Sequence, residues 1–147
     1  MIEERYNVGF NADYSMFEFM SEGPKGKIKK IIHYTQTSNP DVYNLGFGDK
    51  NELTNEIDDF IITNNGDSQK VLATVAATLF VFTDHYPNAF ILATGSTLAR
   101  TRLYRIGISN NLLLIEKDFY IFGYNGKNWL PFQKNTHYES FLAKRKK

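Results

Sequence analysis

The feature that most constrains this chain is a stretch without a single charged residue, from position 71 to position 83. Over the surrounding window, residues 68–85, alanine, valine, leucine and phenylalanine occupy nearly every side of a helical projection. A helix that is apolar all round has to be buried. We therefore predict a central core helix over residues 68–85, ended by Pro87 and Asn88. The rest of the chain must supply the surface that covers it.

Three strands are predicted before this helix, because β-branched and aromatic residues gather in short runs bounded by turn residues. The runs are residues 14–22, 27–37 and 42–47, with turns at residues 23–26 and 38–41. Tyr43, Leu45 and Phe47 alternate along the third run, which places them on one face of a strand. A polar loop is expected over residues 48–55 and a fourth strand over residues 57–63. The N-terminal part is therefore predicted to be a β-meander.

The segments after the core helix alternate between strand and helix patterns. They predict a buried strand over residues 89–94, a second helix over 97–116, a hairpin of 119–124 and 128–132 around Asn125-Gly126, and a short final helix over 137–144. Strands that come first and then mix with helices favour an α+β fold. We expect a single domain over residues 1–147, in which a mostly antiparallel sheet packs against two main helices and the short C-terminal helix.

Charge balance and amino-acid usage narrow the class of protein. Seventeen Lys and Arg residues against sixteen Asp and Glu residues give a formal net charge of +1, which counts against a dedicated nucleic-acid binder. Cysteine is absent, so disulfides and thiolate metal sites are excluded, and the composition fits a reducing compartment. The N-terminal residues lack the basic start and apolar run of a signal peptide, and no apolar stretch approaches a membrane span. We expect a soluble, cytoplasmic protein.

The candidate site is the turn and helix start over residues 93–109, where three arginines closely follow Gly95. Ser96 or Thr97 is suited to the N-cap of the helix. The first amides of a helix lack intrahelical partners, and the helix dipole there favours negative charge. Arginine suits bidentate contact with phosphate or carboxylate. A phosphate-like anion is therefore predicted to bind here, with the candidate ligands Ser96, Thr97, Arg100, Arg102, Tyr104 and Arg105.

The faces of this second helix follow from its turn of about 3.6 residues. Arg100 and Tyr104 fall on one flank, whereas Arg102 and Arg105 fall on the other. The predicted core stripe comprises Ala99, Leu103, Ile106, Leu113 and Leu114. A second interpretation stays open: the Gly-Ser-Thr start is ordinary capping, and the arginines snorkel or pair with carboxylates such as Asp58 and Asp59.

Other polar groups give weaker site predictions. Asp67, in the turn Asn64-Asn65-Gly66-Asp67, could act as an acid, a base or a metal ligand, but capping of the core helix is the simpler explanation. Asp58 and Asp59 point to opposite faces of a strand, so they do not easily share an ion. The three histidines, His33, His85 and His137, show no metal-ligand spacing. We predict no metal site and no cofactor, and we interpret the basic tail, residues 143–147, as a solvated terminus.

The abundant tyrosines admit two interpretations. A stacking platform or an interface could be formed by Tyr34, Tyr43, Tyr104, Tyr120, Tyr124 and Tyr138. We favour core and sheet positions with a solvated hydroxyl for most of them, because a tyrosine ring is largely apolar and only its tip needs a polar partner.

Several stretches together resemble a known family. They are Asn64-Asn65-Gly66-Asp67 before Lys70-Val-Leu-Ala-Thr74, then Gly95-Ser-Thr-Leu-Ala-Arg-Thr-Arg-Leu-Tyr-Arg105, and then Phe132-Gln-Lys-Asn135 with Tyr138-Glu-Ser-Phe-Leu142. The chain resembles a family of small Bacteroidota proteins of unknown function, mainly over residues 60–142. The resemblance implies a bacterial cytoplasmic protein and carries no mechanism with it.

Three functions remain open at this point. We favour a small non-enzymatic binding module whose anionic partner, for example a nucleic-acid backbone, meets the helix start at residues 95–105. The alternative is a protein-interaction or self-associating subunit, suggested by the high aromatic content and the near-zero net charge. The third is a toxin-like enzyme that cleaves phosphodiesters and uses the arginines and Tyr104 to stabilise transition-state charge.

Overall fold

The computed structural model describes residues 5–57, 64–95 and 97–147. Its strands are β1 (Gly9–Phe10), β2 (Met16–Gly23), β3 (Gly26–Gln36), β4 (Val42–Asn51), β5 (Glu56–Ile57), β6 (Phe90–Ala93), β7 (Phe119–Tyr124), β8 (Trp129–Pro131) and β9 (Ser140–Arg145). Its helices are α1 (Ser68–His85), α2 (Leu98–Asn110) and α3 (Leu112–Ile115).

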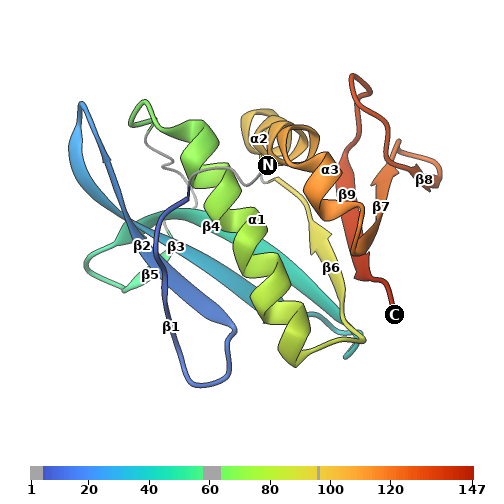
Figure 1. Ribbon diagram of the computed structural model, residues 1–147, viewed down its shortest axis with the longest axis horizontal. Coiled ribbons are helices and arrows are strands. Elements are labelled where there is room, and N and C mark those ends of the chain that lie inside the picture. Colours follow the sequence, from blue (N-terminus) through green and yellow to red (C-terminus); the bar gives the residue numbers. More distant parts are fainter. Residues whose placement is uncertain (1–4, 58–63, 96) are drawn as a thin grey trace.

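Within these residues the strands form a nine-stranded sheet in the order β1-β2-β3-β4-β6-β9-β7-β8, with β5 paired to the end of β4 (Figure 1). Every pairing is antiparallel except that of β4 with β6, which is parallel. The parallel pair needs a crossover, and α1 provides it. The predicted α+β class with a mostly antiparallel sheet is confirmed.

Helix α1, in which residues 71–83 carry no charge, crosses the sheet in front of β3 and β4 (Figure 1), and both of its predicted ends are confirmed. Phe82 of α1 stacks on Tyr34 of β3, with ring centroids 4.2 Å apart, and the Tyr34 hydroxyl is 2.9 Å from the Thr78 hydroxyl. Thr78 and Thr83 also donate to helix carbonyls one turn back, so burial leaves these hydroxyls satisfied. None of the helices in the described residues is long and apolar enough to cross a membrane.

The second predicted helix is divided into α2 and α3 at Asn111. The Asn111 side-chain amide donates to the Gly107 carbonyl, and the Asn111 backbone N–H donates to Gly107 and Ile108. This residue therefore ends α2 with its own hydrogen bonds.

The predicted core stripe of this helix is correct for Leu103 and Ile106, which pack against the core, and wrong for Ala99 and Leu113. Ala99 is exposed and Leu113 is 76% exposed. Thr101 and Tyr104 are buried instead. Gly95 fits so closely against Thr101 that a Cβ atom would collide with its backbone nitrogen, and this contact turns the Thr101 side of the helix inward.

The predicted C-terminal helix over residues 137–144 is wrong, because Ser140–Arg145 is strand β9 between β6 and β7. Phe141 and Ala143 are buried while Leu142 and Lys144 are less so, which is a period of two. Pairing on both sides satisfies the backbone groups of three strands at once.

The predicted loop over residues 48–55 is also wrong in its first half, because β4 continues to Asn51 and buries Gly48 and Asp49. Of the fourth strand predicted over residues 57–63, only Ile57 belongs to a described strand, β5, and residues 58–63 lie outside the described residues. The predicted hairpins are confirmed for β2–β3 and β7–β8. Gly26 and Gly126 turn them with positive φ angles of 91° and 97°.

Gly123 in β7 provides a test of how closely the C-terminal loop packs on the sheet. A Cβ atom at this position would overlap the ring of Tyr138, whose hydroxyl accepts a hydrogen bond from the Gln133 N–H. We expect Gly123→Ala to lower the free energy of unfolding by about 1–3 kcal/mol. Chemical denaturation measures it. Gly9→Ala is the matched control, because nothing lies within 4 Å of its Cβ position; equal effects of the two substitutions would contradict this packing.

Candidate functional site

Thr97 caps helix α2. Its backbone is extended, with φ −136° and ψ 164°, and its Oγ1 accepts the N–H of Arg100 at 3.2 Å. The Thr97 carbonyl accepts both the N–H and the hydroxyl of Thr101. Thr97 is therefore the N-cap, and Ser96, the other predicted cap, lies outside the described residues.

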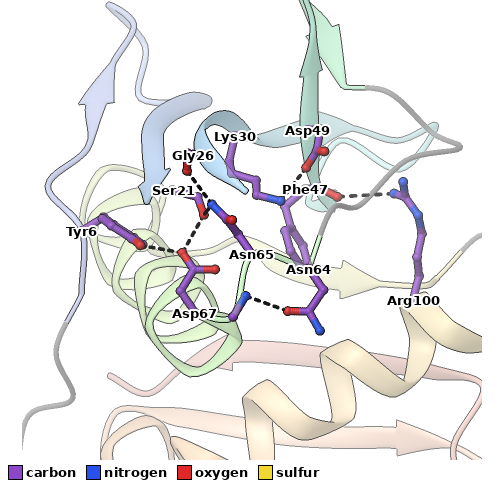
Figure 2. Close-up of polar contacts among 11 residues, drawn as sticks. Tyr6, Ser21, Gly26, Lys30, Phe47, Asp49, Asn64, Asn65, Asp67 and Arg100 are labelled. Atoms are coloured by element: carbon purple, nitrogen blue, oxygen red, sulfur yellow. Dashed lines mark hydrogen bonds and ion pairs between the residues drawn. The ribbon is translucent and has the colours of Figure 1, made fainter. Parts of the chain in front are cut away.

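Two of the predicted ligands attach α2 to strand β4. The Arg100 guanidinium donates to the Phe47 carbonyl at 3.3 Å (Figure 2). The buried Tyr104 hydroxyl donates to the Leu45 carbonyl at 3.1 Å, and desolvation by burial raises the pKa of Tyr104 to about 12. Both side chains leave α2 on one flank, as the helical spacing predicted, and their hydrogen bonds to β4 show that this flank faces the sheet.

Arg102 and Arg105 leave α2 on the other flank. They line a surface pocket of about 210 Å³ together with Leu98, Thr101, His137 and Tyr138. Arg102 is exposed and Arg105 is half-buried. Within the part of the chain that the structure describes, neither guanidinium has a hydrogen bond or an ion pair. Two guanidinium groups one turn apart beside an imidazole suit a phosphate or carboxylate group.

Asp67 stands at the N-cap position of α1, but its side chain makes no capping hydrogen bond. The carboxylate instead accepts the hydroxyls of Tyr6 and Ser21, the latter at 2.6 Å (Figure 2). Burial, and next the hydrogen bond to Asp67, raise the pKa of Tyr6. The prediction that Asp67 caps the helix is therefore correct in position and wrong in contacts. The carboxylate ties the N-terminal segment and β2 to the start of α1.

Asn65 fastens the same turn to the β2–β3 hairpin. Its side chain is 1% exposed, its Oδ1 accepts the Lys25 N–H at 2.8 Å, and its Nδ2 donates to the Gly26 carbonyl at 2.8 Å. Gly66, next in the chain, takes a φ of +76°, as the turn composition predicted.

A buried ion pair, which we did not predict from the sequence, lies beside this turn. Lys30 of β3 is 1% exposed and donates to the carboxylate of Asp49 on β4 (Figure 2). The two residues are direct cross-strand neighbours on the face that carries the core. A signal existed, because Lys30 alternates with Ile32 and Asp49 alternates with Phe47. We infer that this pair orders the sheet, because it joins the neighbouring strands β3 and β4 inside the protein.

The three histidines lie apart. His85 stacks on Tyr14, with ring centroids 3.6 Å apart, His33 belongs to β3, and His137 lines the arginine pocket. In the described ranges no three His, Asp or Glu side chains come together in a way that could hold a metal ion.

The fold and the site define an α+β protein with a cationic surface pocket beside the start of its second helix. The chain belongs to a family of unknown function, DUF6934, whose profile matches residues 2–146. The match extends the resemblance from residues 60–142 to the N-terminal strands. Comparison with curated proteins and with solved structures found no match.

The buried ion pair predicts a large difference between two carboxylates on β4 and β2, the strands on either side of β3. Asp49→Asn removes the carboxylate that accepts from the buried Lys30 ammonium, so the free energy of unfolding should fall by about 3–5 kcal/mol. Glu18→Gln is the control, because Glu18 is exposed and pairs with Lys50 at 2.8 Å, and it should cost less than about 1 kcal/mol. Urea denaturation of both variants measures the costs. A similar cost for both would show that the Lys30–Asp49 pair is not a structural element.

The raised pKa of Tyr104 predicts that the stability of the fold depends on pH in the alkaline range. Its pKa is about 12 in the folded chain and about 10 in an unfolded one. The unfolded state therefore loses its proton first, so this contribution to stability is complete below pH 10 and is lost as the pH rises toward 12. Tyr104→Phe removes the titration and, at neutral pH, the hydrogen bond to Leu45, a loss of about 1 kcal/mol.

The measurement is guanidinium unfolding of both proteins at pH 8 and pH 11. The stability advantage of the wild type should shrink by about 1 kcal/mol at the higher pH. Tyr34, whose pKa burial also raises, titrates in both proteins and cancels in the difference. A constant difference between the two proteins would contradict the assignment.

Proposed function

We propose that the protein is a small, non-enzymatic bacterial binding module, acting in the cytoplasm, which holds a phosphate-like anionic group beside the start of α2. Arg102 and Arg105 carry this proposal, because both face one pocket and neither has an internal partner among the described residues. His137 supplies a third nitrogen-bearing side chain from the segment between β8 and β9. The cysteine-free composition fits the reducing compartment.

The electrostatics of α2 support an anionic ligand. The sequence of α2 contains three arginines and no acidic residue. The N-terminal end of a helix carries a partial positive charge, so cationic side chains in its first turns are unfavourable until a negative group compensates them. An anion near Thr97 and Leu98 would meet the helix dipole and the Arg102 guanidinium together.

The candidate ligands divide into two roles. Arg102 and Arg105 contact the anion, and the helix start after Thr97 contributes its dipole and backbone amides. Ser96, the other candidate ligand, lies outside the described residues. Arg100 and Tyr104 position α2, because their described hydrogen bonds go to backbone carbonyls of β4. The bound group is a phosphate or a chemically similar anion of a nucleotide, a nucleic-acid backbone or another phosphorylated partner.

The test is isothermal titration calorimetry with tripolyphosphate at low ionic strength. Wild-type protein should bind, and Arg102→Gln/Arg105→Gln should lose at least about tenfold in affinity, because a hydrogen bond to a charged group contributes about 1.5–3 kcal/mol. The matched control is Lys25→Gln/Lys117→Gln, which removes the same charge from two exposed residues away from the pocket. Equal losses in the two double variants would reduce the effect to net charge and contradict the pocket.

A further inference from the structure

The outer face of the C-terminal half of the sheet presents aromatic side chains to solvent. The inner positions of β6, β9 and β7, for example Ile91, Phe141 and Ile121, meet residues of α1, α2 and α3 around a small apolar cavity of about 70 Å³. Side chains alternate along a strand, so the positions between them face away from the helices. We define the aromatic face as Phe90, Tyr120, Phe122, Tyr124 and Trp129 on these strands and β8.

The register of the strands brings these rings onto one surface. Phe90 lies opposite Lys144, which lies opposite Tyr120, so these three form one row across β6, β9 and β7. Tyr124 lies opposite Trp129 in another row, with their ring centroids 5.2 Å apart. Tyr120 is 55% exposed and Trp129 is 43% exposed, although both carry large apolar rings.

Positive charge accompanies the rings. The Lys146 ammonium lies 5.3 Å from the centre of the Tyr120 ring, and the Lys144 ammonium lies 5.8 Å from the centre of the Phe90 ring. No Asp or Glu occupies an outward position of β6, β7, β8 or β9. Off the strands, Glu116 and Lys117 line a pocket together with Tyr120 and Lys146. Lysines therefore outnumber the acidic residue beside the rings, and this charge balance favours an anionic ligand with flat apolar groups.

The size of the aromatic face argues against a stable protein interface. Four strands at about 4.8 Å spacing, with two outward positions on β6 and β8 and three on β7 and β9, span roughly 15 Å in each direction, or about 200 Å². A stable interface buries about 800 Å² on each partner. The exposed rings instead suit two or three nucleobases. Aromatic side chains stack two or three bases in the same way on the four-stranded sheets of RNA-recognition domains.

We propose that the aromatic face binds single-stranded nucleic acid, with bases stacked on Tyr120 and Trp129 and the backbone phosphates beside Lys144 and Lys146. Stacking accepts any base, since every base has a π-face, so the binding is tolerant of sequence. The aromatic face shares no residue with the arginine pocket. The two proposals therefore stand or fall separately.

Trp129 is the one tryptophan in the chain, so its fluorescence reports on this face without a label. The experiment titrates wild-type protein with unlabelled 12-nucleotide oligo-dT and, in parallel, oligo-U at low salt. We expect saturable quenching of Trp129 with both, and much weaker quenching with a DNA duplex of the same length, whose bases are already stacked. An absence of quenching by both single strands would overturn the proposal.

The decisive variant is Tyr120→Leu, which removes the exposed ring and keeps the apolar bulk and the Trp129 signal. Affinity should fall at least about fivefold. Phe10→Leu is the matched control, because Phe10 is 57% exposed in β1 at the opposite edge of the sheet, and it should leave the affinity unchanged. Equal affinities of the wild type and Tyr120→Leu would overturn the stacking.

The contribution of phosphate contacts to the affinity is measured from its dependence on salt concentration. Each neutralised phosphate of a single strand contributes about −0.7 to the slope of log affinity against log salt, so Lys146→Gln should reduce the slope by about that amount. An unchanged slope would show that Lys146 does not contact the phosphates. Light scattering of the same samples measures self-association. If the wild type is a dimer and Tyr120→Leu is a monomer, the aromatic face binds a second copy of the chain, and the proposal is overturned.

Discussion

The burial of helix α1 against the inner face of the sheet, through its uncharged residues 71–83, is the interaction on which the rest of the structure depends. Because α1 has no polar side, it needs cover from strands on one side and from α2 and α3 on another. The stack of Phe82 on Tyr34 and the paired hydroxyls of Tyr34 and Thr78 lie at the centre of that contact. The same helix makes the crossover from β4 to the parallel strand β6, so the order of the sheet also follows from where α1 packs.

The polar groups at the N-terminal end of α1 have a structural role, which distinguishes them from the arginines that we propose to bind a ligand. Asp67, Asn65 and the Lys30–Asp49 pair have their hydrogen-bond partners inside the protein. Groups satisfied in this way order the turn and the hairpin, but they leave little capacity for a ligand. Arg102 and Arg105 differ, since they face solvent without a partner in the described ranges. The aromatic face on the other side of the sheet is a second such surface.

The sequence predicts those elements that depend on local patterns. The window of α1 could be placed because residues 71–83 carry no charge and Pro87 and Asn88 follow it, and the helical spacing correctly separated Arg100 from Arg102. Strand β9 could not be predicted, because six residues with two inward side chains fit either a helix or a strand until β6 and β7 pair with them. The Lys30–Asp49 pair depends on a cross-strand register, and the rotation of α2 depends on the fit of Gly95 against Thr101. Local alternation places Lys30 and Asp49 on the core face of their strands, but it encodes neither their pairing nor the rotation of α2.

We propose that the buried polar network around Lys30, Asp49, Asn65 and Asp67 is structural, and that the arginine pocket and the aromatic face are two separate binding surfaces. The most direct measurement is a ¹H–¹⁵N NMR titration of the labelled protein, first with inorganic phosphate and then, in a fresh sample, with oligo-dT. We expect phosphate to shift the amides around Arg102, Arg105 and His137, and the oligonucleotide to shift those of β6, β9, β7 and β8. Shifts from either ligand that centre on Lys30 and Asn65 instead would contradict the claim, because they would show that the buried network is itself the site.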